Sequence, residues 1–397
     1  MRKLLHLLAL PCILLLFLGS CAKNYDIEDL KKAALDNDRD EIKTILRSKV
    51  WSSEEISPLL FELNFSKFDH HETAYLFLDN GADINYLLDG ETVLSRTFSK
   101  SSTLSDLDLK NLLSMGADPT LGEHAPLPRY FYSKKADWNL TDVLLEYVVD
   151  HDMVNYTDRE NQLPLLAWAA AGTNHRAVSV LLSNGADPDS VGTHGWTPLF
   201  YAVRGLRSES INDEYDYNVE KILSAMLVHG ADITRADEHG NTLLTSFLLF
   251  KTDEGALNDG EISKVLKYLL KHGCNPNIGN AKNQYPLEAA LEKGLIYSAS
   301  VLIQYGANPF IQRKDGTTVF SVISDDETSI RQLINYTGLG RKALRTSDNE
   351  KVIQLLFRED GIVKKADPAY GTVDTYSRSG LGRKLINDLI RKYYHVS

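Results

Sequence analysis

Gly185-Ala186-Asp187, followed after about ten residues by Gly195-Trp196-Thr197-Pro198-Leu199, is the stretch of sequence that decides the fold. The first triplet begins with a glycine that is able to adopt positive φ and so to end a helix in a tight turn. In the second phrase, Thr197 is able to cap a helix whose first residue is Pro198, where the missing N–H costs nothing. The predicted order is helix, glycine turn, loop and capped helix.

Both phrases recur in register along the chain. Copies of the triplet begin at Gly81, Gly116, Gly185, Gly230, Gly273 and Gly306, and the intervals between them are 35, 69, 45, 43 and 33 residues. The interval of 69 divides into two ordinary periods if a degenerate copy lies near His151–Asn155, and the intervals of 45 and 43 contain insertions of about ten residues. The second phrase returns at residues 240–244, 284–287 and 316–319.

These phrases resemble the ankyrin repeat, whose consensus runs Gly-Thr-Pro-Leu-His, then two helices, then Gly-Ala-Asp-Val-Asn. The resemblance implies an all-α ankyrin-repeat solenoid of helix-turn-helix units joined by β-hairpin-like loops, with about nine units in residues 26–340. The first unit (Asp26–Val50) and the last (Asp315–Tyr336) are expected to be atypical, because they cover the ends of the stack. Phe200 and Leu244 replace the family's His, so the turns beside them are expected to be looser.

Residues 1–20 are predicted to be an export signal. Arg2 and Lys3 precede an apolar run over residues 4–18, which is shorter than the roughly 20 residues of a membrane span. Residues 18–21 resemble a bacterial lipobox, which implies that Cys21 is lipidated and that residues 21–25 form a tether. A plain secretory signal is the alternative. Ala22 implies, again by resemblance, the outer membrane facing the periplasm.

The cysteines are consistent with this prediction. If Cys12 leaves with the signal and Cys21 carries lipid, Cys274 is alone, and no internal disulfide is possible in an oxidising compartment.

Residues 341–397 are predicted to form a separate helical extension. They hold 12 Lys and Arg against 7 Asp and Glu, whereas the whole chain has a net charge of −11. The final segment places Leu385, Ile386 and Leu389 on one helical face and basic residues on the other. Its expected role is a cap on the last repeat, and a basic surface for anionic lipid or an acidic partner is the alternative.

The sequence contains no motif that predicts an enzyme, a cofactor or a metal. His-Glu-x-x-His, Gly-x-Ser-x-Gly, Gly-x-x-x-x-Gly-Lys and Cys-x-x-Cys are absent. His272 and Cys274 flank a glycine, but the preceding unit has His229 and Ala231 in the same places, which favours a structural role. His70-His71 is interpreted as a loop between units.

Two acidic insertions, Gly205–Asn218 and Lys251–Glu261, are expected between the helices of consecutive units. Calcium binding is one hypothesis for them, and solvated surface is the preferred one.

Partner binding is predicted at the loops between each triplet and the next helix, because they mix aromatic and charged side chains. The candidates are Tyr86, Asp89, Asp189, His194, Trp196, Arg235, Glu238, Asn280, Tyr285, Phe310 and Lys314. For Trp196 and Tyr285, packing on the neighbouring hairpin is an equal alternative.

The hypothesis from sequence is a membrane-anchored protein-interaction module, an adaptor, inhibitor or immunity-type protein, that binds a protein in the bacterial cell envelope. One alternative is an envelope structural protein with a membrane-contacting C-terminal helix. A weaker one is an enzyme with an unrecognised site in residues 341–397. An exported acidic chain argues against nucleic acid as a partner.

Overall fold

A computed structural model describes residues 24–100, 104–133, 137–205, 213–250 and 257–308, together with residue 311. The chain divides into two compact units, one containing residues 1–130 and 136–147 and the other containing residues 131–135 and 148–397. Both units consist of helices that follow one another in pairs. The described elements include no β-strand, and the loops contain only isolated bridges such as Thr157 to Pro164.

The first unit begins with a helix pair capped by Asp26, whose Oδ1 accepts the backbone N–H of Asp29 at 3.0 Å. Its helices, in chain order, are α2 (Ile27–Leu35), α3 (Arg39–Ser48), α4 (Ser53–Ile56), the 3-10 helix η1 (Ser57–Glu62), α5 (Phe68–Asp79), α6 (Val93–Lys100), α7 (Asp106–Ser114), α8 (Pro126–Tyr132) and α9 (Trp138–Asp150). The last residues of α8 and α9 fall in the second unit.

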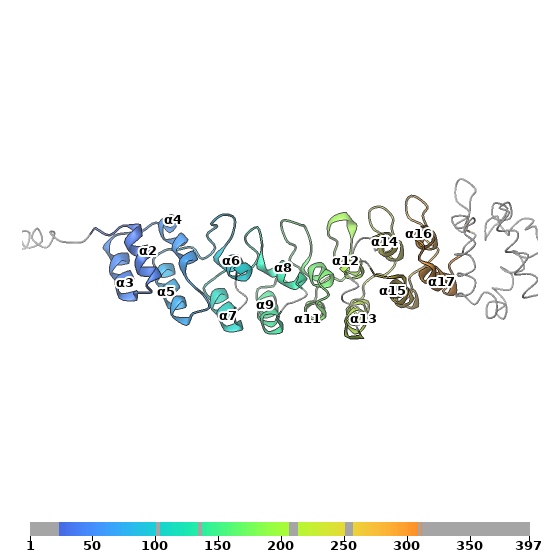
Figure 1. Cartoon of the computed structure of the whole chain (residues 1–397), viewed down its shortest axis with the longest axis horizontal. Helices are drawn as coiled ribbons and strands as arrows, with labels where there is room; N and C mark the ends of the chain where they lie inside the picture. The colour runs from blue at the N-terminus through green and yellow to red at the C-terminus, as the bar shows by residue number, and fades with distance from the viewer. Residues whose placement is uncertain are drawn as a thin grey trace, which may run out of the picture. The chain divides into compact units, whose positions relative to one another are not determined.

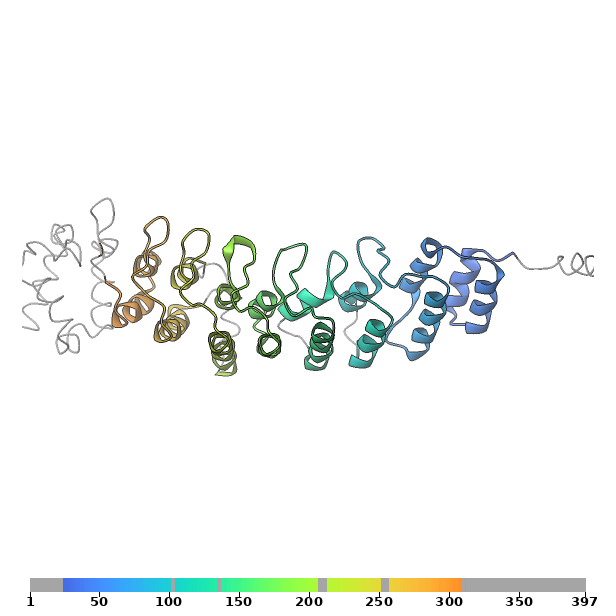
Figure 2. The same cartoon turned by 180° about the vertical axis from the view of Figure 1, so that it is seen from behind.

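The second unit contains α10 (Leu165–Ala171), α11 (His175–Ser183), η2 (Thr193–Gly195), α12 (Pro198–Gly205), α13 (Asp213–Val228), α14 (Leu243–Phe250), α15 (Asp259–Lys271), α16 (Pro286–Glu292) and α17 (Ile296–Gln304). Within this unit α12, α14 and α16 form one row, α11, α13, α15 and α17 form a second row, and the hairpin loops project beyond the first (Figures 1 and 2). This is the all-α ankyrin-repeat solenoid expected from the sequence.

Small residues allow the first-row helices to approach closely. Ala169, Ala170, Ala289 and Ala290 are fully buried. A Cβ added at Gly205 would lie 2.2 Å from the backbone oxygen of Ala171. A Cβ added at Gly172 would lie 2.4 Å from the backbone oxygen of Phe131. The ends of α8, α10 and α12 are therefore neighbours in backbone contact.

Each second helix ends in the predicted glycine turn. Gly185 has φ of 87°, and the N–H of Ala186 donates to the oxygen of Leu181 at 2.9 Å, as in a Schellman motif. At the degenerate repeat, Asp152 takes this place with φ of 55°. Asp is one of the few residues other than glycine that visits this region, so the repeat keeps its geometry after losing its glycine.

An asparagine clamp joins consecutive repeats. Asn85 Nδ2 donates to the backbone oxygen of Gly116 at 2.9 Å, and its Oδ1 accepts the N–H of Asp118 at 2.7 Å. The equivalent bonds run from Asn155 to Gly185 and Asp187, and from Asn277 to Gly306 and Asn308. Each clamp satisfies a donor and an acceptor that the glycine turn leaves unpaired.

Threonine at this position forms no such clamp. Thr234 Oγ1 donates to Asp232 Oδ1 at 2.6 Å, inside its own turn. Asp189 forms half of a clamp, because its carboxylate accepts the N–H of Asp232 at 3.0 Å but has no proton to donate. Arg235 supplies a further bond between the repeats, since its Nη1 donates to the backbone oxygen of Asp189 at 3.0 Å.

We predict that Asn277→Ala lowers the free energy of unfolding by about 1–2 kcal/mol, because it removes two hydrogen bonds between repeats. Urea unfolding of the full chain measures the change. Thr234→Ala is the matched control and should cost less, because it removes bonds within a single turn. Equal costs for the two variants would contradict the assigned role of the clamp.

The first helix of several repeats begins with a threonine cap. The hydrogen bonds of that threonine side chain are made with the residue three positions later. Thr92 Oγ1 accepts the N–H of Ser95 at 3.1 Å, while Ser95 Oγ accepts the N–H of Thr92 at 2.8 Å. Thr242 Oγ1 lies 3.3 Å from Thr245 Oγ1. The register shows that Thr245, and not Leu244, occupies the family's His position; Leu244 is a fully buried core residue.

Phe200 leaves one threonine hydroxyl without a partner. Thr197 is 1% exposed, and its Oγ1 has no hydrogen-bond partner among the described residues. The predicted side-chain cap is therefore not made there, and the first helical bond comes from the Thr197 carbonyl, which accepts the N–H of Phe200 at 2.9 Å.

We predict that Thr197→Val raises the free energy of unfolding by about 1 kcal/mol, because a buried hydroxyl without a partner carries an uncompensated desolvation cost. Thr92→Val is the control and should lower stability by about 1 kcal/mol, since Thr92 is a working cap. Both are measured by urea unfolding. The same sign for the two substitutions would refute the difference between the caps.

Two sequence predictions about loops are wrong. His70 and His71 were expected in a loop but lie inside α5, a helix that begins without a side-chain cap. Part of each insertion is helical and not loop, because α13 begins at Asp213 and α15 begins at Asp259.

Several predictions concern residues outside the described part of the chain. These are the export signal, the lipidation at Cys21, the last unit Asp315–Tyr336 and the extension 341–397. No helix in the described ranges has the length and apolarity needed to span a bilayer.

Candidate functional site

The predicted partner-binding residues divide into exposed and packed side chains. Asp89, His194, Arg235 and Glu238 are exposed, while Tyr86, Asp189 and Tyr285 are half-buried. Trp196 and Asn280 are buried, at 7% and 8% exposure. Phe310 and Lys314 lie outside the described residues.

Trp196 is held by packing on the neighbouring hairpin, which is the alternative left open by the sequence. Its Nε1 donates to Asp237 Oδ2 at 3.2 Å. Asp237 also accepts Asn241 Nδ2 at 3.0 Å, and Asn241 Oδ1 in turn accepts Asn280 Nδ2 at 2.9 Å. Three successive hairpins are therefore joined by one buried chain of hydrogen bonds, which explains the burial of Asn280.

The exposed charges are brought together at the tips of two hairpins. His194 Nδ1 lies 3.0 Å from Glu238 Oε1, and His239 Nδ1 lies 3.8 Å from the same atom. The N–H of Glu238 donates to the backbone oxygen of His194 at 3.3 Å. His194 adopts φ of 65°, a conformation that is uncommon for a residue other than glycine. Solvent screens these contacts, so each stabilises the fold by well under about 1 kcal/mol.

The structure adds an aromatic–arginine surface that the sequence prediction missed except for Trp196. It comprises Tyr132, Trp168, Trp196, Tyr201 and Arg204, from α8, α10, α12 and the hairpin before α12. Tyr132 and Trp168 meet edge to face with ring centroids 5.7 Å apart, as do Trp196 and Tyr201 at 5.5 Å. The Arg204 guanidinium lies 4.3 Å from the centroid of the Trp196 ring.

Two of these side chains, Trp168 and Tyr201, occupy matching places on adjacent helices. Trp168 stands four residues before Gly172, and Tyr201 stands four residues before Gly205. The backbone contacts made at the two glycines align the ends of α8, α10 and α12. The position four residues before each of these glycines was the signal in the sequence, since it holds an aromatic residue in both repeats.

Hydrogen bonds fix the rings of this surface. Trp168 Nε1 donates to Asp158 Oδ2 at 2.9 Å, and the Tyr201 hydroxyl donates to the Thr193 carbonyl at 3.3 Å. Burial raises the pKa of Tyr201 above its usual value, so its hydroxyl remains a donor at neutral pH. Tyr132 is 49% exposed and Arg204 is exposed. A rigid aromatic layer therefore carries accessible groups at its surface, which is the composition of binding hot spots.

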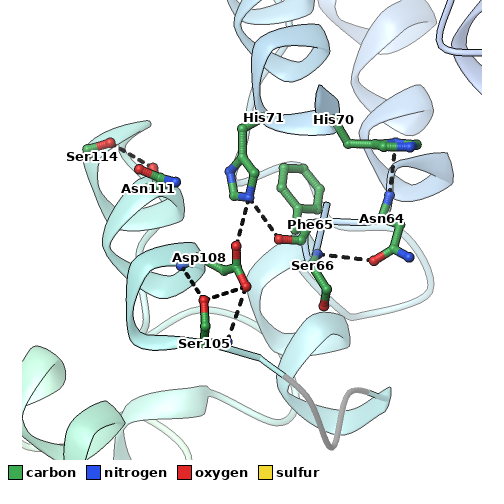
Figure 3. Close-up of polar contacts among 9 residues, drawn as sticks. All are labelled: Asn64, Phe65, Ser66, His70, His71, Ser105, Asp108, Asn111 and Ser114. Atoms are coloured by element: carbon green, nitrogen blue, oxygen red, sulfur yellow. Dashed lines mark hydrogen bonds and ion pairs between the residues drawn. The ribbon is translucent and has the colours of Figure 1, made fainter. Parts of the chain in front are cut away.

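A serine, an aspartate and a histidine also meet between α5 and α7 (Figure 3). His71 Nε2 lies 2.8 Å from the Phe65 carbonyl and 3.3 Å from Asp108 Oδ1. Because a carbonyl only accepts, Nε2 carries a proton. Ser105 Oγ donates to Asp108 Oδ2 at 2.6 Å and is not bonded to the imidazole.

This arrangement does not activate a nucleophile. A catalytic serine needs a base within hydrogen-bond reach of its hydroxyl, and Ser105 has only the carboxylate of its own helix cap. His71 is 3% exposed and joins α5 to α7. The buried His71 therefore links α5 to the half-buried Asp108 of α7, and Ser105 is the exposed cap of α7.

The described residues contain no group of three His, Cys, Asp or Glu side chains arranged for a metal ion. His272 stacks on Tyr268 with ring centroids 4.1 Å apart, and its Nδ1 lies 2.9 Å from the Tyr268 carbonyl. Cys274 is buried, and burial raises the pKa of its thiol to about 12. His272 is therefore engaged within its own repeat, whereas Cys274 Sγ lies 3.9 Å from the backbone oxygen of Ile233 in the preceding repeat.

Two acidic residues of the second insertion serve as helix caps. Asp259 accepts the backbone N–H groups of Tyr297 and Ser298, at 2.7 and 2.9 Å, and so caps α17 from α15. Glu261 Oε2 accepts the N–H of Asn258 at 2.7 Å in a capping box. These contacts give the two carboxylates a structural role as helix caps, which was not part of either the calcium-binding hypothesis or the solvated-surface hypothesis.

We predict that iodoacetamide does not label Cys274 in the folded protein at pH 8, because the buried thiol is not ionised at that pH. Labelling should appear in parallel with unfolding as urea is added. Mass spectrometry of the peptide containing residue 274 measures it. Rapid labelling in the absence of urea would contradict the burial and the raised pKa.

Comparison with known proteins agrees with this architecture. A family model described as ankyrin repeats in many copies matches residues 166–212, which include most of the aromatic–arginine surface. A putative ankyrin repeat protein L91 of Acanthamoeba polyphaga mimivirus is 27% identical over 156 residues, covering 38% of this chain and 23% of that protein. The E3 ubiquitin-protein ligase KEG of Arabidopsis thaliana is 29% identical over 128 residues, covering 32% of this chain and 7% of that protein.

These matches agree with the ankyrin-repeat solenoid seen in the structure. Ankyrin repeats are typically non-catalytic protein–protein interaction modules, which is the role that the repeats imply for this chain. The matched regions span less than a quarter of either relative, at 23% and 7% of their lengths.

Proposed function

We propose that this protein is a membrane-anchored adaptor or inhibitor, an immunity-type protein being one specific form, that binds a protein partner in the bacterial cell envelope. The observation that carries the binding role is the aromatic–arginine surface, in which fixed rings support the exposed side chains of Tyr132 and Arg204. Large side chains that are already immobilised lose little entropy when they bind, and such residues dominate the energetics of interfaces.

The location in the envelope rests on residues 1–21. A basic start, an apolar run and Cys21 support anchoring through lipid. A lipid chain attaches a protein to one face of a membrane without crossing it. On this proposal the partner is a periplasmic protein or the periplasmic part of an outer-membrane protein.

Photo-crosslinking in the bacterial cells that produce the protein tests the binding role. A photoreactive residue is placed at position 171, at the half-buried end of α10 beside Gly205, and crosslinked proteins are identified by mass spectrometry. We expect one dominant protein, with a yield that falls at least about tenfold in Tyr132→Ala. Tyr297→Ala is the matched control, because Tyr297 on α17 is 47% exposed whereas Tyr132 is 49% exposed. Equal yields for the two variants would exclude this surface.

Cys21→Ser tests the anchor independently. The variant should move from the membrane fraction to the soluble fraction, while the wild type incorporates labelled palmitate. Unchanged fractionation of the variant would exclude lipid anchoring at Cys21 and leave the binding role standing.

A further inference from the structure

We propose that Asn80 and Asn184 are sites of spontaneous deamidation, and that the hydrogen bonds closing each glycine turn control the reaction. Each asparagine directly precedes the glycine of such a turn. The reaction takes place only when the turn opens, and it leaves aspartate or isoaspartate at the joint between two repeats. This inference concerns the turns and is independent of the binding function proposed above.

The reaction needs no reactant other than water. The backbone nitrogen of the glycine attacks the side-chain carbon Cγ of the asparagine and forms a C–N bond. The proton of that nitrogen departs with the amide nitrogen, which leaves as ammonia. Water then opens the five-membered succinimide ring at one of its two carbonyls, which gives aspartate or isoaspartate. Glycine favours the first step, because it has no Cβ to hinder the approach of its nitrogen.

Both Asn-Gly sequences of the chain lie at such turns. Asn80 and Asn184 are exposed to solvent, so burial does not protect either side chain. The other turns place a residue without an amide before the glycine, namely Met115, His229, His272 and Tyr305. Any protection of the two asparagines must therefore come from the conformation of their turns.

The closed turn prevents ring formation. A succinimide ring is close to planar, so the glycine nitrogen must lie on the same side of the Cα–C bond as the Cβ of the asparagine. With ψ of 15° at Asn80 and 17° at Asn184, that nitrogen almost eclipses the asparagine's own backbone nitrogen and is turned away from Cβ. A large rotation about ψ, and thus opening of the turn, must precede the reaction.

Hydrogen bonds also hold both reacting groups in place. The N–H of Gly185 donates to the carbonyl of Leu182 at 3.1 Å, and Asn184 Nδ2 donates to the carbonyl of Val180 at 2.8 Å. The corresponding bonds at Asn80 measure 3.0 and 2.8 Å. The attacking nitrogen and the amide that it attacks are therefore both engaged with the preceding turn of the helix.

The preceding repeat adds a further restraint at Asn184. Asn155 Nδ2 donates to the backbone oxygen of Gly185 at 3.2 Å, and its Oδ1 accepts the N–H of Asp187 at 2.9 Å. Rotation about ψ of Asn184 moves Gly185 away from Asn155 and breaks this clamp. The rate of deamidation at Asn184 therefore reports how often this joint between repeats opens.

A different side chain restrains the turn after Asn80. Ser57 Oγ accepts the N–H of Asp83 at 2.8 Å, and Ser57 is fully buried. Since Asn155 makes no contact with this turn, each of the two sites serves as an internal control for the other.

The product no longer closes the turn. An aspartate carboxylate at position 184 has no proton to donate to the carbonyl of Val180, and its negative charge is unfavourable at the C-terminal end of a helix. Isoaspartate also lengthens the backbone by one methylene group, so the turn does not close in its former register. A joint that has reacted therefore stays loosened.

Two other repeats make the same cap without an amide. His229 Nδ1 lies 2.8 Å from the carbonyl of Ala225, and His272 Nδ1 lies 2.9 Å from that of Tyr268. Each carbonyl is four residues earlier, as at Asn184, and because a carbonyl only accepts, the imidazole is the donor. Histidine thus keeps the cap without the reactive group.

Timed incubation of the full-length protein at pH 8 measures both reactions. The protein is digested, and mass spectrometry follows the peptides that contain residues 80 and 184. We expect both asparagines to react at least about tenfold more slowly in the folded protein than in guanidinium chloride. Equal rates in the folded and unfolded protein would overturn the proposal.

Asn155→Ala tests control by the clamp. It should accelerate the reaction at Asn184 at least about fivefold, because the loss of two hydrogen bonds makes opening easier. Asn80 should change less than about twofold. Asn277→Ala is the matched control, because it removes an equivalent clamp elsewhere and should accelerate neither site more than about twofold. Circular dichroism verifies that both variants remain folded.

Two results would refute control by the clamp. The first is equal acceleration of Asn80 and Asn184 in Asn155→Ala. The second is equal acceleration of Asn184 by Asn155→Ala and Asn277→Ala, because either result indicates general destabilisation.

Asn184→His tests the chemistry and its consequence together. It should abolish the mass change at position 184 and leave the midpoint of urea unfolding close to that of the wild type. Asn184→Asp, which is one product of the reaction, should lower that midpoint. An unchanged midpoint in Asn184→Asp would contradict the loosening of the joint, and a persisting mass change in the Asn184→His peptide would exclude Asn184 as the site.

Discussion

The structure depends on one backbone conformation, the positive φ that ends the second helix of each repeat. The residue in this turn releases the chain from the helix and leaves a carbonyl and an N–H that the preceding repeat satisfies where it supplies an asparagine. Gly116 and Gly185 are satisfied by the side chains of Asn85 and Asn155. The turn therefore ends a helix and also fixes the distance between neighbouring repeats, which in turn aligns the first helices and the rings that they carry.

Most of this architecture could be predicted from the sequence, because its signals are local. The glycine turns and the Thr-Pro-Leu starts each act within a few residues, and a degenerate copy is recognisable when Asp152 replaces the glycine. The errors arose where no local signal exists. Helix α5 begins without a side-chain cap, so His71 was assigned to a loop although it is a buried contact between helices.

The binding surface was harder to predict than the fold, because it depends on contacts between repeats. The sequence singled out Trp196 as an aromatic residue in a loop, but its indole N–H bonds to Asp237, which lies 41 residues later. In the sequence, nothing distinguishes Tyr132 and Arg204 from other surface residues. Their helices are brought close to α10 by the backbone contacts at Gly172 and Gly205. Periodicity identifies which residues face the same way, whereas the depth of each side chain is decided by its neighbours in three dimensions.

The cap that Asp259 provides to α17 has a consequence for the order of assembly. Leu295, at the start of α17, forms no side-chain cap, so the N–H groups of Tyr297 and Ser298 depend on a carboxylate from α15. The asparagine clamps point in the same direction, from a side chain in an earlier repeat to the backbone of a later one. During synthesis the N-terminal part of the chain appears first. The side chains that cap or clamp a later repeat are therefore already in place when the backbone that they bond is made, and a folded repeat can guide the folding of the next one.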